Sequence, residues 1–212
     1  MINEHLSEAC PLCYQAAKLF YRDTHLQCEQ CGAIFRATVK HLNPDEEKKR
    51  YLSHNNDVND SRYQNFVKPI VDAVTAHFGP QHQGLDFGAG TGPVISKLLT
   101  DRSYKIRQYD PFFHPHSALL KKKYDYIVAC EVIEHFHKPR EEFNRLTKML
   151  LDRGMLFIMT MIYDDSIEFA RWFYKNDESH CFFYREKTLH WIQKEFSFSN
   201  LKIDKRLIIY TK

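Results

Sequence analysis

The sequence lacks any long apolar run, and no stretch approaches the roughly 20 residues that a helix needs to cross a membrane. Residues 1–5 also lack the basic and apolar regions that mark a secretory signal peptide. We therefore expect a cytoplasmic protein with no membrane partner.

Neither sign of charge dominates, since 30 basic residues oppose 27 acidic ones and leave a formal net charge of +3. That excess is too small to indicate nucleic-acid binding by itself. The hydrophobic fraction of 43% is sufficient for a core, and 212 residues allow one ordinary domain plus a small one. Internal repeats and low-complexity segments are missing. The composition thus indicates a globular protein.

Six cysteines are present, and because disulfides are rare in the cytoplasm, metal binding is the role that their spacing can indicate. Two C-x-x-C pairs let four thiolates reach one tetrahedral ion; the four are Cys10, Cys13, Cys28 and Cys31. Residues 19–27 fit two short strands around a turn. We expect a structural zinc ribbon over residues 1–42, with free or redox cysteines as the alternative. The sequence leaves open whether the ribbon contacts a partner or substrate, or only caps the neighbouring domain.

Residues 84–92 form the most informative stretch, a short apolar run followed by glycines at alternate positions. Residues without a Cβ allow a strand to turn sharply into a helix while its backbone closes on a ligand. The next strand, residues 104–110, ends in Asp110 at the sheet edge where open α/β folds bind ligands. A carboxylate there suits a ribose diol, although it could also cap a helix. Residues 111–123 are too few for another full strand with its connections.

Residues 85–92, with Tyr109–Asp110 and residues 124–136, resemble the motifs of class I S-adenosylmethionine-dependent methyltransferases over about residues 44–212. The competing dinucleotide fold carries G-x-G-x-x-G, whereas this chain has G-x-G-x-G. The resemblance implies that the glycines contact the methionine part of the cofactor and that an acidic residue holds its ribose. The implied cofactor residues are Asp86, Gly88, Gly90, Gly92, Asp110, Cys130 and Glu131.

The expected fold is therefore α/β, a Rossmann-like and mostly parallel sheet with helices on both faces, preceded by the zinc ribbon. Its third strand should be short or missing. The methyltransferase domain should occupy residues 81–212, after a helical lid or linker over residues 43–80. By the same resemblance, Tyr51 and His54 are lid or substrate candidates. The basic run of residues 48–50 is interpreted as a solvated helix face.

Residues 131–135 concentrate ionisable groups directly after a buried strand. His135 could be the general base for a hydroxyl, an amine or an acidic carbon. The segment also resembles ubiquinone-pathway O-methyltransferases, which implies a possible Mg²⁺ at Glu131, Glu134 and His135. Alternatively, these three residues only orient the loop below the cofactor.

Residues 169–184 are dense in aromatic side chains around the polar pair Asp177 and His180. Such a segment could wall an acceptor pocket, with Trp172 and Tyr174 contacting the substrate. His180 is the second candidate base, or else a satisfied buried imidazole.

The sequence thus predicts methyl transfer from S-adenosylmethionine to a small or medium-sized acceptor through an oxygen, nitrogen or carbon nucleophile. A ribosomal RNA base methyltransferase is the alternative enzyme, because cysteine ribbons also precede such domains. The basic residues form no obvious stripe, which disfavours it. A non-catalytic zinc-ribbon adaptor is the alternative outside enzymes.

Overall fold

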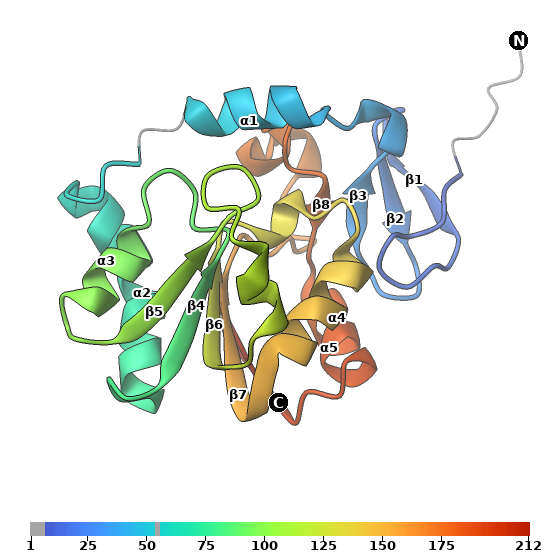
Figure 1. Ribbon diagram of the computed structural model, residues 1–212. Helices are drawn as coiled ribbons and strands as arrows, with labels where there is room; N and C mark the ends of the chain where they lie inside the picture. Colours follow the sequence, from blue (N-terminus) through green and yellow to red (C-terminus); the bar gives the residue numbers. More distant parts are fainter. Residues whose placement is uncertain (1–6, 54–55) are drawn as a thin grey trace, which may run out of the picture.

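The computed structural model describes residues 7–53 and 56–212 (Figure 1). A six-stranded sheet in the order β5-β4-β6-β7-β10-β9 forms its centre. The strands are β4 (Gln83–Phe87), β5 (Lys105–Tyr109), β6 (Tyr124–Cys130), β7 (Leu150–Met159), β9 (Asn200–Asp204) and β10 (Leu207–Thr211). Strands β5, β4, β6 and β7 are parallel, and β10 and β9 add an antiparallel hairpin. This arrangement confirms the expected Rossmann-like α/β fold.

The connection between β5 and β6 confirms that the third strand is missing. Within this fully described connection, residues 111–123 add no strand to the sheet and form only a short 3-10 helix, Ser117–Lys121. Strand β5 is consequently the edge of the sheet, where its lysine and arginine disfavour pairing with another strand.

Alternating side chains of the central strands divide the core between two faces. Tyr126 and Val128 of β6 pack with α2 (Ser61–His77) and α3 (Val94–Thr100). Ile127, the residue between them, faces the opposite core, which contains α4 (Pro139–Met149) and α5 (Glu186–Glu195). Because strand residues alternate in direction, these apolar runs bury both faces of the sheet.

The N-terminal module forms a second sheet with the order β1-β2-β3-β8. Its members are β1 (Ala17–Tyr21), β2 (His25–Cys28), β3 (Ile34–Arg36) and β8 (Phe182–Phe183). The two strands expected within residues 19–27 are confirmed, but β8 belongs to the C-terminal half of the chain. All four clustered cysteines also share one core with the central sheet. The module therefore packs against and caps the neighbouring domain.

Helix α1 (Pro44–Leu52) lies across the carboxyl ends of the parallel strands (Figure 1). Its capping box pairs the Asn43 side chain with the Glu46 backbone, and the Glu46 side chain with the Asn43 backbone. The remaining 3-10 helices are Thr38–Lys40, Ile133–His135, Phe169–Arg171 and Phe173–Asn176. Helix α5 begins at Glu186, and the Thr188 hydroxyl in its first turn accepts a hydrogen bond from the Arg185 amide.

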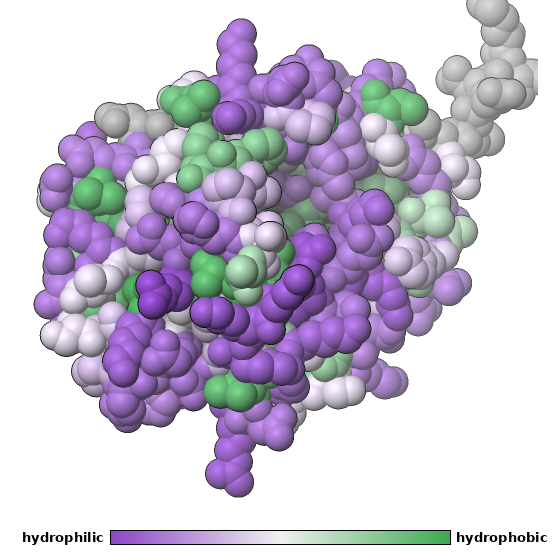
Figure 2. Space-filling model, viewed as in Figure 1, coloured by the Kyte–Doolittle hydropathy of each residue, from purple (hydrophilic) through white to green (hydrophobic). Residues whose placement is uncertain are grey.

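The face seen in Figure 2 is mostly hydrophilic, with hydrophobic residues scattered in small groups. No helix within the described residues combines the length and apolarity needed to span a membrane.

His25, the first residue of β2, is buried among aromatic rings, and its ring centroid lies 5.1 Å from that of Phe169. Burial lowers the pKa of His25 to about 3. Between that value and the ordinary 6.5, the unfolded chain takes up a proton that the folded chain does not, so stability falls as pH falls.

We expect a His25→Phe variant to escape this loss of stability. Between pH 6.5 and 5, the free energy of unfolding of the parent should fall by about 2 kcal/mol relative to the variant. Denaturant unfolding of both proteins at several pH values checks this, and parallel pH curves would contradict it.

Candidate active site and cysteine cluster

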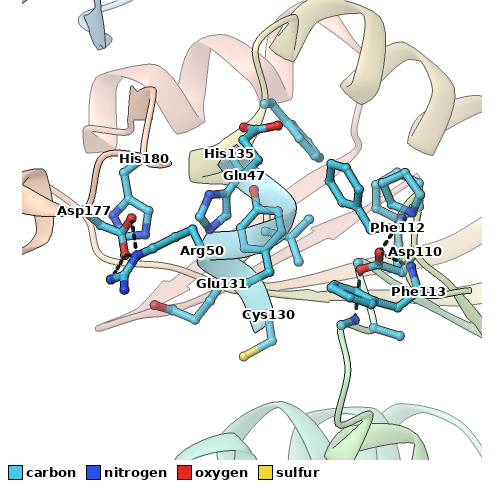
Figure 3. A pocket seen from close by; sticks show the side chains of 18 of the residues that line it. Glu47, Arg50, Asp110, Phe112, Phe113, Cys130, Glu131, His135, Asp177 and His180 are labelled. Carbon is cyan, nitrogen blue, oxygen red and sulfur yellow. Dashed lines mark hydrogen bonds and ion pairs between the residues drawn. The ribbon is translucent and has the colours of Figure 1, made fainter. Parts of the chain in front are cut away.

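A cavity of about 850 Å³ opens at the carboxyl ends of β4, β5 and β6, below helix α1. Its wall combines the glycine loop, the ends of β5 and β6, one face of α1 and the segment of residues 173–180. In Figure 3, His135 and His180 lie on one side of the cavity, and Asp110 with Phe112 lies on the other. The cavity thus has two chemically different sides.

The three glycines of the loop differ in what a side chain would contact at each position. Gly88 has a φ of +78°, and a Cβ there would lie 2.5 Å from a methyl group of Val132. Gly92 packs on the backbone at Asn56, since a Cβ would lie 1.7 Å from that carbonyl oxygen. At Gly90, with a φ of +62°, a Cβ would meet no atom of the described residues nearer than 3.8 Å. Gly88 and Gly90 both line the cavity, but only Gly90 leaves the side-chain position open, because Val132 and Asn56 occupy that space at Gly88 and Gly92.

Asp110 ties the glycine loop to the end of β5. Its Oδ1 accepts hydrogen bonds from the Phe112 and Phe113 amides at 2.8 and 3.1 Å, and its Oδ2 accepts one from Gly90 at 3.0 Å. A carboxylate offers about four acceptor positions, so one remains on Oδ2. That position can accept a hydroxyl from a ligand in the cavity. Asp110 caps no helix here, because its partners Phe112 and Phe113 lie in a turn.

Asp86 lies behind the glycine loop and is buried. Its Oδ2 accepts a hydrogen bond of 2.7 Å from the Ser96 hydroxyl, and burial raises its pKa to about 6. Among the described residues, the cavity wall includes neither Asp86 nor Gly92.

Cys130, the last residue of β6, and Glu131, which follows the strand, line the cavity. Glu131 has a φ of +52°, a conformation that residues other than glycine adopt rarely and that clusters at functional sites. Arg206 donates a hydrogen bond of 2.7 Å to its carboxylate, and burial raises the pKa of Glu131.

His135 and His180 meet in the cavity, with ring centroids 4.8 Å apart. The Nδ1 of His135 donates to the Ser179 carbonyl at 3.0 Å, and the Nδ1 of His180 donates to the Tyr174 carbonyl at 2.7 Å. A neutral imidazole whose Nδ1 carries the proton keeps a lone pair on Nε2. Both predicted bases are therefore anchored through Nδ1, and this tautomer suits His135 for accepting a proton at Nε2.

Glu134 is fully buried below these histidines. The Thr160 hydroxyl donates to it at 3.0 Å, and the Tyr174 hydroxyl also donates to it. The ligand atoms that lie within 4.8 Å of one another here belong to Glu134, His135 and His180, a set that omits Glu131. The predicted set of Glu131, Glu134 and His135 is therefore not the set whose ligand atoms converge, which favours the orienting role for these residues.

The lid and acceptor candidates separate into two groups. Tyr51 lines the cavity from α1, with its ring 5.2 Å from that of His135, and Tyr174 lines it from the opposite segment. Trp172 packs instead in a cluster with Tyr163, Phe169 and Phe183, outside the described cavity wall. His54 lies outside the described residues.

Residues 48–50 are exposed, as expected for a solvated face, and Arg50 also forms a 2.7 Å ion pair with Asp177 (Figure 3). This bond holds the pKa of Asp177 well below its usual range, although burial opposes it. Glu47, one turn earlier on α1, contacts the His137 imidazole at 3.0 Å. These partners lie 127 and 90 residues apart, and only the Glu47-to-Arg50 spacing of one helical turn hints at a shared face.

The four cysteines belong to the turn before β1 and to the end of β2 with the turn that follows it, and their sulfurs lie within 4.8 Å of one another. The Cys10 and Cys31 sulfurs are 3.6 Å apart, and those of Cys13 and Cys28 are 3.3 Å apart. Ligands at about 2.3 Å from a tetrahedral zinc would be about 3.8 Å from each other.

The two C-x-x-C turns have the same backbone design. In each, the residue after the second cysteine, Tyr14 or Gly32, has a positive φ and donates its amide to the carbonyl of the first cysteine. The duplicated turns aim all four thiols at one point, and this donor set fits a closed S₄ zinc site.

Comparison with known proteins places the fold among methyltransferases. The Burkholderia thailandensis 1,6-didemethyltoxoflavin-N1-methyltransferase aligns with a TM-score of 0.57 at 14% identity, over 90% of this chain and 99% of that one. An O-methyltransferase family protein from the same organism gives 0.53 at 12% identity, over 78% of this chain and 61% of that chain. Human N-acetylserotonin methyltransferase gives 0.54 at 11% identity, over 80% and 56% of the two chains. Identities this low show a shared fold.

A match between the sequence and a family model identifies the family. No curated protein matches it, but the family model described as methyltransferase domain matches residues 58–203, more than half of the chain. The chain therefore belongs to the methyltransferase domain family and, as a member of it, is a methyltransferase.

Proposed function

We propose that the protein transfers a methyl group from S-adenosylmethionine to a small or medium-sized acceptor. The observation that carries this proposal is the two-sided cavity, with bare glycine backbone and Asp110 on one side and a histidine pair on the other. The solved toxoflavin-pathway enzyme holds S-adenosylhomocysteine with its acceptor, and the human N-acetylserotonin enzyme holds S-adenosylmethionine. These relatives support a small acceptor rather than RNA.

The cofactor side consists of Gly88, Gly90 and Asp110, joined by Cys130 and Glu131 at the end of β6. The remaining acceptor position on Asp110 Oδ2 receives a ribose hydroxyl. The buried Asp86 and the packed Gly92 contribute by fixing the loop.

Methyl transfer from a sulfonium is an in-line displacement, which requires alignment and a deprotonated acceptor. The cofactor supplies the activated methyl group. His135 Nε2 takes the proton from the acceptor hydroxyl, amine or acidic carbon, while its Nδ1 remains bonded to the Ser179 carbonyl. His180 is the second candidate for the same role. Tyr51 and the exposed Phe173 bound the acceptor side of the cavity.

A base must be neutral at working pH, and burial lowers the pKa of His135 below its usual 6.5. We therefore expect the His135 imidazole to titrate below pH 6.5 and to be neutral at pH 7. Titration of its ring signals by nuclear magnetic resonance, with His135→Gln for assignment and the exposed His190 as control, checks this. A midpoint above 6.5 would remove His135 as the favoured base.

The cysteine cluster holds a structural zinc ion. All four sulfurs are buried and close enough for one tetrahedral ion, so the closed set leaves no position for a substrate. The zinc stabilises the N-terminal module and takes no part in the methyl transfer.

Calorimetric titration with S-adenosylhomocysteine tests the proposal directly, because the product cofactor needs no known acceptor. We expect saturable binding with one site per chain. An absence of heat at millimolar ligand would favour the adaptor, and binding of a nicotinamide dinucleotide instead would overturn the cofactor assignment. Screening small hydroxylated and amino compounds with a labelled methyl donor then identifies the acceptor.

A further inference from the structure

Arg36 is the last residue of β3 in the N-terminal module, here also called the cysteine module, and its side chain contacts the acceptor side of the neighbouring domain. Its Nε donates to the carbonyl of His180 at 3.3 Å. Its Nη2 donates to the carbonyls of Lys175 and Asp177 at 3.2 and 3.3 Å. One partly buried guanidinium thus joins three points of a segment that lies about 140 residues away in sequence.

This segment, residues 174–180, carries side chains of the cavity wall but has little regular structure of its own. Its carbonyls are directed to side-chain donors, since His180 bonds to Tyr174 and His135 bonds to Ser179. Backbone groups in an irregular segment need such partners to hold one conformation. Arg36 supplies three of the bonds, so it has the largest share among the described donors.

The module also anchors the strand that follows this segment. Phe35 of β3 pairs with Phe182 of β8, and the Arg36 amide donates to the Cys181 carbonyl at 2.9 Å. The cofactor side is held differently: the Gly88 and Ala89 amides donate to the Tyr109 carbonyl. The module therefore supports the acceptor side, whereas β5 supports the cofactor side.

We propose that Arg36 is a positioning residue for methyl transfer, which holds the segment of residues 174–180 so that His180 and Asp177 face the acceptor. This inference rests on the proposed function of the cavity. It gives the cysteine module a role in the site: to fix the geometry on the acceptor side without contacting the cofactor.

The test compares Arg36→Gln and Arg36→Lys with Arg22→Gln, an exposed arginine of the same module. Amide hydrogen exchange of a peptide covering residues 173–181 should become at least about tenfold faster in Arg36→Gln, because three hydrogen bonds are lost. Arg36→Lys should be intermediate, since an ammonium cannot reproduce the planar fork. The ring signals of His180 should shift in both, and Arg22→Gln should behave as the parent.

Metal content and S-adenosylhomocysteine affinity separate positioning from general damage. Both quantities should stay within about twofold of the parent in Arg36→Lys. This variant keeps a positive charge at position 36, so it still decides the question if Arg36→Gln fails to fold. Unchanged exchange in residues 173–181 would overturn the inference, as would a uniform rise that includes residues 84–92. Failure of the parent to bind S-adenosylhomocysteine would overturn the proposed function instead, and the exchange result would still decide the role of Arg36 in holding the segment.

Discussion

A Cys28→Ser variant is expected to lose its zinc and to melt at least about 10 °C below the parent protein. Cys28 is completely buried, and its sulfur lies 3.3 Å from that of Cys13. A serine hydroxyl is a poor zinc ligand, so three thiols would remain around a weakened site. The effect should be large because the strands of the module are short and their core includes the cysteines themselves. Metal analysis after gel filtration and thermal melting measure the two consequences.

Cys130→Ser is the matched control, because Cys130 lies outside the four-sulfur cluster. It should keep one zinc per chain and melt close to the parent. A Cys28→Ser protein with full zinc content, or one that loses zinc and melts normally, would remove the structural role of the cluster. The Cys28→Ser variant also tests the role of Arg36, because unfolding of the module should loosen the segment of residues 174–180 together with β8.

Local patterns were sufficient to predict most of the fold. Alternate glycines after an apolar run identify the turn between β4 and α3, and the shortness of residues 111–123 identifies the missing strand. The C-x-x-C spacing likewise predicts where the sulfurs meet, since each pair is fixed by one tight turn. In the first two cases, and within each C-x-x-C turn, the controlling contacts span few residues, so the sequence carries them directly.

The parts of the site that were missed depend on contacts between distant segments. Arg50 follows two lysines and is exposed as they are, and nothing in the local sequence indicates its ion pair with the distant Asp177. Arg36 sits in a strand too short to be recognised, and its partners are carbonyl groups, which any residue could supply. Trp172 was predicted to contact the substrate but packs in a buried cluster, because a sequence rich in aromatic residues is equally compatible with a pocket wall and with a buried cluster.

The cofactor side gives the second large expected effect: an Asp110→Asn variant should bind S-adenosylhomocysteine about 10- to 100-fold more weakly. Asparagine keeps one carbonyl oxygen, which can still accept from the Phe112 and Phe113 amides. Its NH₂ group replaces Oδ2, so it cannot accept from the Gly90 amide or from a ribose hydroxyl. Hydrogen bonds to a charged acceptor contribute about 1.5 to 3 kcal/mol each, and each 1.4 kcal/mol is a tenfold change in affinity.

Asp101→Asn, on the exposed end of α3, is the control and should bind S-adenosylhomocysteine like the parent. Calorimetry measures both variants, and amide exchange at residues 88–91 reports whether the glycine loop has loosened. Weaker binding with an unchanged loop would assign the loss to the ribose contact, and weaker binding with a loosened loop would assign part of it to the tether on Gly90. Undiminished affinity in Asp110→Asn would show that the remaining position on Oδ2 receives no ligand hydroxyl, and the cofactor would then have to lie elsewhere in the cavity.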